Sequence, residues 1–168
     1  MDIVIGVDFG TSYTKAAVGM LDKIYPVNWS GISRTNSEFL LASEYTRAKV
    51  GGVFLGQKPN ATADEVKMDL KLPFIHPHVS MGSIANAAVF LATVLRYVRA
   101  WIYRFHQAKI GAAKVRWSLN IGAPSNGLED ARLVVAYQRL GLSAWRLSQR
   151  PIDDCMADAT DVVAASGH

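Results

Sequence analysis

Residues 8–15 combine a carboxylate, a glycine, hydroxyl side chains and a lysine around one sharp turn. Gly10 has no Cβ, which permits such a turn directly after an apolar run. The backbone N–H groups of Thr11, Ser12 and Tyr13 can then face one concavity, and a nest of this kind binds phosphate oxygens. The segment therefore predicts a phosphate-binding loop, with an ordinary hairpin turn as the alternative.

Two charged side chains flank this predicted loop. Asp8 ends the apolar run, and we expect its carboxylate to hold a magnesium ion through water, because Mg²⁺ keeps much of its hydration shell. Lys15 is expected to reach a phosphate as a point charge. Together the two residues predict a site for a phosphate bound with magnesium.

Short strands must position the loop. Apolar and β-branched residues predict strands over Ile3–Phe9 and Thr14–Met20, with the loop between them, and a third strand over Ile24–Trp29. Residues 30–82 are rich in Ser, Gly, Asn and Pro but keep apolar clusters that need burial. We therefore expect an inserted subdomain in that segment.

A long helix and a fourth strand are predicted after the insertion. Apolar residues at alternating four- and three-residue spacing predict a helix over about Ser83 to Lys109. Ser83 is the expected N-cap, and Gly111 is expected to end the helix. Alternation of apolar and polar residues then predicts a strand over Val115–Ile121.

The C-terminal part is predicted to be mostly helical. A helix is expected over Leu128–Leu140, and Gly141 is expected to break it. Leu142–Ser148 fits either a strand, which we take as the fifth, or a continued helix. Pro151 is expected to open a last helix that reaches about Ala165. This order predicts an α/β fold of the ribonuclease-H-like kind, a mixed five-stranded sheet with helices on both faces.

Composition favours one packed domain. The chain has 168 residues, and half of them are hydrophobic. Its net charge of +4 suits an anionic partner. Cys155 is the single cysteine, so a reducing compartment, and hence the cytoplasm, is expected. The apolar stretch Ile84–Ile102 is as long as a membrane span, but Arg96 and Arg99 argue against insertion.

Segment 8–15 resembles the first phosphate motif of the superfamily that joins actin, sugar kinases and the seventy-kilodalton heat-shock chaperones. Four more segments resemble chaperone motifs in the same order and spacing. They are Phe54-Leu55-Gly56-Gln57, Asp69-Leu70-Lys71, residues 118–124 and residues 141–151. The resemblance implies a divergent first lobe of the chaperone nucleotide-binding domain, covering residues 1–168 with the inserted subdomain at about 30–82.

This resemblance implies ATP or ADP with Mg²⁺ as the ligand. Asp8 would organise the water ligands of the magnesium ion. Lys71 would stabilise charge that develops on the γ-phosphoryl group, or position the attacking water. Lys15 resembles a phosphate-binding lysine of actin-like filament proteins. The residues that would hold the β- and γ-phosphates are Gly10, Thr11, Ser12 and Tyr13.

Two departures from the family pattern bear on turnover. Arg150 stands where the chaperones have a glutamate that couples the nucleotide to lobe movement. The second phosphate motif and the adenosine segment, which belong to the second lobe, are not found before His168. We therefore expect ATP hydrolysis only where a second lobe completes the site. Expected partners are a nucleotide, a client or co-chaperone protein, and a second copy through the uncovered cleft face, without membrane or nucleic acid.

Two other functions stay open. Acidic residues near the end could join Asp8 in a two-metal nuclease of the Holliday-junction-resolvase kind, which shares the ribonuclease-H-like fold. They are Asp153, Asp154, Asp158 and Asp161, and a solvated acidic helix face is the interpretation that we favour for them. The other alternative is a non-catalytic protein-interaction module, which an exposed apolar patch on the cleft side would favour.

Overall fold

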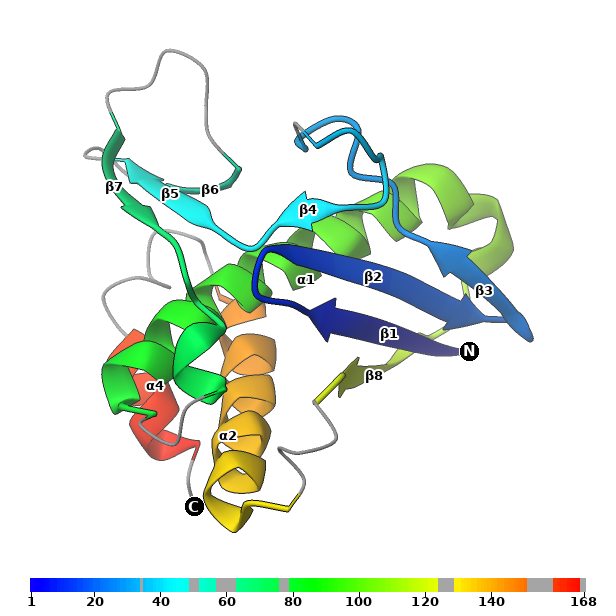
Figure 1. The fold of residues 1–168 in the computed structure, drawn as a ribbon. Helices are drawn as coiled ribbons and strands as arrows, with labels where there is room; N and C mark the ends of the chain where they lie inside the picture. The colour runs from blue at the N-terminus through cyan, green and yellow to red at the C-terminus, as the bar shows by residue number, and fades with distance from the viewer. Residues whose placement is uncertain are drawn as a thin grey trace.

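A mixed sheet forms the centre of the fold in the computed structural model (Figure 1). The structure describes residues 1–33, 35–48, 52–56, 63–75, 79–123, 129–150 and 159–166. The sheet consists of β1 (Asp2–Phe9), β2 (Tyr13–Met20), β3 (Lys23–Pro26), β4 (Leu41–Ala42) and β8 (Arg116–Ile121). Its order is β3-β2-β1-β8, and β4 pairs with the start of β2. The predicted mixed five-stranded sheet is thus confirmed, although β4 supplies the fifth strand.

The direction of the strands follows from the length of the connections. β1 and β2 are joined by a short loop and run antiparallel. β2 and β3 are also joined by a short turn and run antiparallel. β8 follows a long helical crossover and runs parallel to β1. A parallel neighbour requires such a crossover because the chain must return to the same end of the sheet. The crossover places the ends of β1 and β8 beside the β1–β2 loop.

Only one face of the sheet is covered by helices in the part of the chain that the structure describes. Ile3, Ile5 and Val7 of β1 are buried, and they pair in register with Trp117, Leu119 and Ile121 of β8 on the same face. The residues between them, such as Asp8 and Ser118, are exposed on the opposite face. The predicted helices on both faces are therefore wrong for the described residues.

Helix α1 (Met81–Ile110) supplies more residues to the hydrophobic core than any other described element. It begins one turn earlier than expected, because the N-cap is Ser80, whose hydroxyl accepts from the Ser83 N–H at 3.1 Å. It ends at Gly111 as expected, where φ is +55°. Its length and composition would allow it to cross a membrane, but 61% of its apolar stretch is buried in the fold.

Helix α2 (Ala131–Ser148) is longer than expected and packs on α1. Gly141 does not break it, and Leu142–Ser148 continues the helix rather than forming a strand. The apolar face of α2 supplies the reason, because Leu140, Ala144 and Leu147 are fully buried on both sides of the glycine. The chain after β8 therefore continues as helix on the buried side of the sheet as far as Ser148.

We expect Gly141→Ala to stabilise the protein by about 0.5–1 kcal/mol, because alanine is the better helix residue. The added Cβ would lie 3.5 Å from the Ile121 side chain, an ordinary contact. Gly111→Ala is the matched control and should destabilise, since its φ of +55° strains any other residue. Urea unfolding of both variants measures the difference, and a loss of stability in Gly141→Ala would contradict a continuous helix.

The segment between β4 and α1 in the sequence forms a second, smaller sheet. It has the order β6-β5-β7 and is followed by a short 3₁₀-helix, η1. The elements are β5 (Tyr45–Ala48), β6 (Val53–Leu55), β7 (Ala63–Lys67) and η1 (Leu72–Phe74). This segment brings Lys71, at the start of η1, towards the end of β1.

The last described element is α4 (Ala159–Ala165), which packs against both α1 and α2. It lies within the last predicted helix, but the expected start at Pro151 lies outside the described residues. Figure 1 shows α1 running behind the sheet, with α2 and α4 packed together against it at the lower left.

Candidate functional site

The β1–β2 loop is closed tightly by its own backbone. Phe9 pairs with Thr14, and the Gly10 N–H donates to the Tyr13 carbonyl oxygen at 3.1 Å. A Cβ on Gly10 would lie only 2.3 Å from that same oxygen. Glycine is thus required here by the close approach of the backbone, as the sequence suggested.

Backbone donors remain available at the tip of this loop. Among the described residues, no protein group accepts a hydrogen bond from the N–H of Thr11 or of Ser12, and both residues are exposed. The carbonyl of Ser12 accepts from the Ser43 N–H at 2.9 Å, which ties the loop to β4. Two fixed, unpaired N–H donors of this kind suit an oxyanion.

Asp8 and Lys15 face each other across β1 and β2. They are register partners on the open face of the sheet, and both are exposed. Directly opposed residues have Cβ atoms about 4.5–5.5 Å apart. Together with Phe39, Asn120 and other residues they line a hollow of about 510 Å³. The structure therefore places both charged groups next to the loop, at the mouth of one hollow.

Lys71 lies on the other side of the end of β1, inside the core. Its side chain is only 5% exposed, and its Nζ lies 4.9 Å from the ring centroid of Phe9 and 4.7 Å from that of Tyr137. Burial lowers the pKa of Lys71 to about 8, and the nearby Asp8 carboxylate opposes this effect. Cation–π contacts with two rings hold the ammonium group in place of water.

Tyr137 is the residue of this site that sequence reasoning missed. Its ring contacts the Lys71 ammonium group, with 4.7 Å between Nζ and the ring centroid. Its hydroxyl has no hydrogen-bond partner among the described residues, and burial raises its pKa to about 12. Only the fold could reveal this role, because Lys71 and Tyr137 belong to segments far apart in the sequence.

The structure thus brings the predicted site residues to one end of β1, but in two layers. Asp8, the loop over Gly10–Tyr13 and Lys15 share the surface layer. Lys71 is in the layer beneath, within electrostatic reach of Asp8. The surface layer thus combines two N–H groups left unpaired by the described residues, a carboxylate and a lysine, and the buried lysine beneath adds positive charge to the same end of β1.

Several other predictions stay untested. Asp153, Asp154, Cys155 and Asp158 lie outside the described residues, as does the side chain of Asp161. In the part that the structure describes, no three histidine, cysteine or acidic residues gather as a metal site. The coupling role at Arg150 is likewise a prediction.

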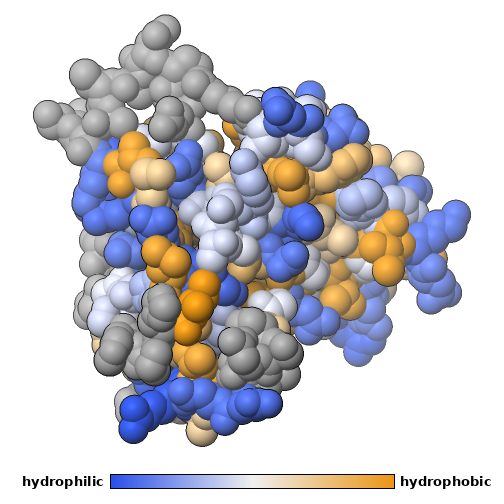
Figure 2. Space-filling model, in the orientation of Figure 1, coloured by the Kyte–Doolittle hydropathy of each residue, from blue (hydrophilic) through white to orange (hydrophobic). Residues whose placement is uncertain are grey.

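The described residues on the face of the molecule that carries the loop form no single large apolar surface (Figure 2). Figure 2 shows its hydrophobic residues in separate patches with hydrophilic residues between them. This distribution does not favour the interaction-module alternative on that face.

Comparison with known proteins identifies no relative. No protein-family model, no curated protein and no solved structure matches this chain.

Proposed function

We propose that this chain binds the phosphate groups of a nucleotide at the β1–β2 loop, as the first lobe of an actin-like ATPase domain of the heat-shock-chaperone type. One observation carries the proposal. Thr11 and Ser12 present unpaired N–H groups to solvent, in a loop that only glycine at position 10 allows.

The arrangement of the strands supports the same proposal. β1, β2 and β3 are antiparallel neighbours, and β8 joins β1 in parallel after the α1 crossover. We propose that this sheet is ribonuclease-H-like, with residues 30–82 as the inserted subdomain. In that fold, the resemblance places the first phosphate motif in the turn between the first two strands, which is where the open amides lie.

The charged groups around the loop fit a magnesium nucleotide. The Asp8 carboxylate is exposed beside the loop, where it would hold Mg²⁺ through water. Magnesium bound with the nucleotide would neutralise phosphate charge. Lys15, across from Asp8, would contact a phosphate oxygen. Lys71 would add positive charge from beneath the loop, where burial keeps the field unscreened by water.

Weak binding of phosphates without measurable recognition of the adenosine is the expected behaviour. Calorimetric titration with pyrophosphate, Mg·ADP and Mg·ATP should give dissociation constants on the order of 0.1–1 mM, and adenosine should give no heat. Lys15→Ala should weaken binding of each phosphate ligand by roughly three- to tenfold, because one charged contact is removed.

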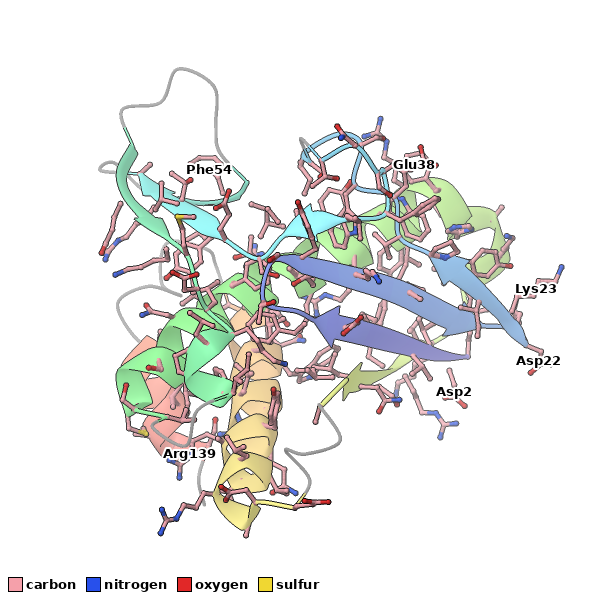
Figure 3. All side chains as sticks on the ribbon, viewed as in Figure 1. Asp2, Asp22, Lys23, Glu38, Phe54 and Arg139 are labelled. Atoms are coloured by element: carbon pink, nitrogen blue, oxygen red, sulfur yellow. The ribbon has the colours of Figure 1, made fainter. Side chains whose placement is uncertain are left out.

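Lys23→Ala is the matched control for this titration. Lys23 is also an exposed strand lysine, but it lies at the far end of the sheet from the loop (Figure 3). Its removal lowers the net charge equally and should leave the affinity unchanged within about twofold. An equal loss of affinity in Lys15→Ala and Lys23→Ala would show that the phosphates bind only through general charge attraction. If adenosine bound as tightly as ATP, the phosphate site would be refuted.

A further inference from the structure

β8 has a free edge. The N–H groups of Arg116 and Gly122 donate to the carbonyl oxygens of Met1 and Val7 at 2.9 and 2.8 Å. Because the pleat alternates, the N–H and C=O groups of the three residues Trp117, Leu119 and Ile121 point away from β1. Among the described residues, β8 pairs with β1 alone. Three backbone donors and three acceptors therefore stand open along this edge.

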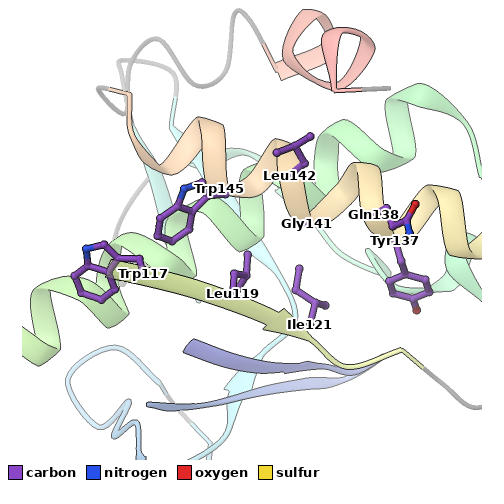
Figure 4. Close-up of a pocket in the computed structure, with 8 residues that line it drawn as sticks. All are labelled: Trp117, Leu119, Ile121, Tyr137, Gln138, Gly141, Leu142 and Trp145. Carbon is purple, nitrogen blue, oxygen red and sulfur yellow. The ribbon is translucent and has the colours of Figure 1, made fainter. Parts of the chain in front are cut away.

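An apolar groove runs beside the same edge (Figure 4). It has a volume of about 460 Å³ and lies between β8 and α2. Its lining residues are Trp117, Leu119, Ile121, Tyr137, Gln138, Gly141, Leu142 and Trp145. Figure 4 shows the two tryptophans close together at one end and Tyr137 at the other. Leu142, on the α2 side, is 40% exposed.

An open strand edge beside an apolar groove suits an added β-strand better than a compact ligand. An edge with apolar residues is a template for pairing with another chain. Alternate side chains of an added strand would enter the groove, while those between would lie on the open face. An added strand would pair with the open N–H and C=O groups of β8 and would cover the groove at the same time.

We propose that a second copy of this chain is the occupant, with its β8 added antiparallel to β8 about a two-fold axis at Leu119. In this register Leu119 faces its own counterpart, and Trp117 faces Ile121 of the second copy. On the opposite face Ser118 meets Asn120. Apolar residues thus meet apolar ones and polar residues meet polar ones, which a shift by one residue would destroy.

The charges along β8 permit this pairing. Arg116 is its one charged side chain, and Asp2 of the same chain already binds it through two hydrogen bonds, at 2.6 and 2.7 Å. The antiparallel register places the two arginines at opposite ends of the paired strands. No like charges therefore face each other across the two-fold axis.

The size of the contact sets the strength of the dimer. Two six-residue strands and the groove of each copy form a small contact beside the roughly 800 Å² per partner of a stable interface. We therefore expect a dissociation constant on the order of 100 µM. The pairing through β8 is also closed, because one two-fold axis uses the β8 edge of both copies and leaves no β8 edge for a third.

Sedimentation equilibrium of the full chain between about 5 and 500 µM tests the proposal. The mass should rise from 18.3 kDa towards twice that value. Leu119→Lys should weaken the dimer at least tenfold, since two ammonium groups would then oppose each other. Asn120→Lys adds the same charge to the same strand but faces Ser118, so it should retain the dimer within about threefold.

Cysteine cross-linking tests the register. In a Cys155→Ser background, Leu119→Cys should form a disulfide-linked dimer on mild oxidation, since directly opposed residues lie within disulfide reach. Asn120→Cys has no counterpart opposite and should stay monomeric. A wild-type chain that is monomeric at 500 µM, a dimer that Leu119→Lys leaves unchanged, or equal cross-linking at both positions would each overturn the proposal.

Discussion

Lys71→Met is expected to raise the free energy of unfolding at pH 7 by up to roughly 3 kcal/mol. Burial between Phe9 and Tyr137 lowers the pKa of Lys71 from 10.5 to about 8, so the fold disfavours the charged form. Methionine is similar in length, carries no charge and packs well on aromatic rings. The same change should weaken phosphate binding if Lys71 supplies charge to the loop.

The pH dependence of stability shows whether Lys71→Met stabilises the protein by removing a buried charge or only by better packing of the methionine. Below pH 8 the lysine is protonated in both the folded and the unfolded chain, so its contribution is constant. Between about pH 8 and 10.5 the unfolded chain binds the additional proton, and wild-type stability should rise with pH. Lys71→Met should show no such rise.

Two tyrosines set the upper limit of the pH range over which wild-type stability rises. Burial raises the pKa of Tyr45 and of Tyr137 to about 12, from an ordinary value of 10.0. Above pH 10 the unfolded chain loses these protons first, so stability should fall in both proteins. Wild-type stability should therefore peak near pH 10, and that of Lys71→Met should have no such peak.

Urea unfolding from pH 6 to 11 measures both curves. Lys23→Met is the control. Because Lys23 is exposed, its replacement should give the same dependence of the free energy of unfolding on pH as the wild type. If Lys71→Met were less stable than the wild type at pH 7, the Lys71 ammonium group would stabilise the fold, contrary to the prediction.

The β1–β2 unit is the part of the fold that sequence predicts well. Its strands are mostly apolar, and the turn between them lies at a glycine, so local patterns determine both elements. The expected strands over Ile3–Phe9 and Thr14–Met20 differ from β1 and β2 by one residue each at their starts. The positions of Asp8 and Lys15 on one face then follow from the alternation of side chains along a strand.

The course of the chain after β8 was predicted poorly, for a physical reason. A glycine lowers helix propensity by about 1 kcal/mol, and a local interpretation therefore ends the helix at Gly141. Burial of Leu140, Ala144 and Leu147 outweighs that cost, but this burial exists only once α2 packs on α1. The same limit applies to Lys71, whose burial depends on Phe9 and Tyr137 from distant segments.

Gly10→Ala is expected to lose phosphate binding and to destabilise the protein. The new Cβ would lie 2.3 Å from the Tyr13 carbonyl oxygen, a backbone atom that no rotamer change can move away. Overpacking of this kind costs roughly 1–3 kcal/mol, and relief requires the loop to open. An open loop would separate the amides of Thr11 and Ser12, so pyrophosphate affinity should fall at least tenfold.

Gly19→Ala is the control that isolates this effect. It adds the same methyl group to the same hairpin, but its Cβ would lie 3.8 Å from the Val4 side chain, at an ordinary contact distance. We expect it to retain pyrophosphate binding within about twofold and to unfold within about 1 kcal/mol of the wild type. If Gly10→Ala kept wild-type affinity while folded, the phosphate would not be bound by these amides. Binding would then depend on Lys15 and Lys71 alone, and the loop would be an ordinary turn.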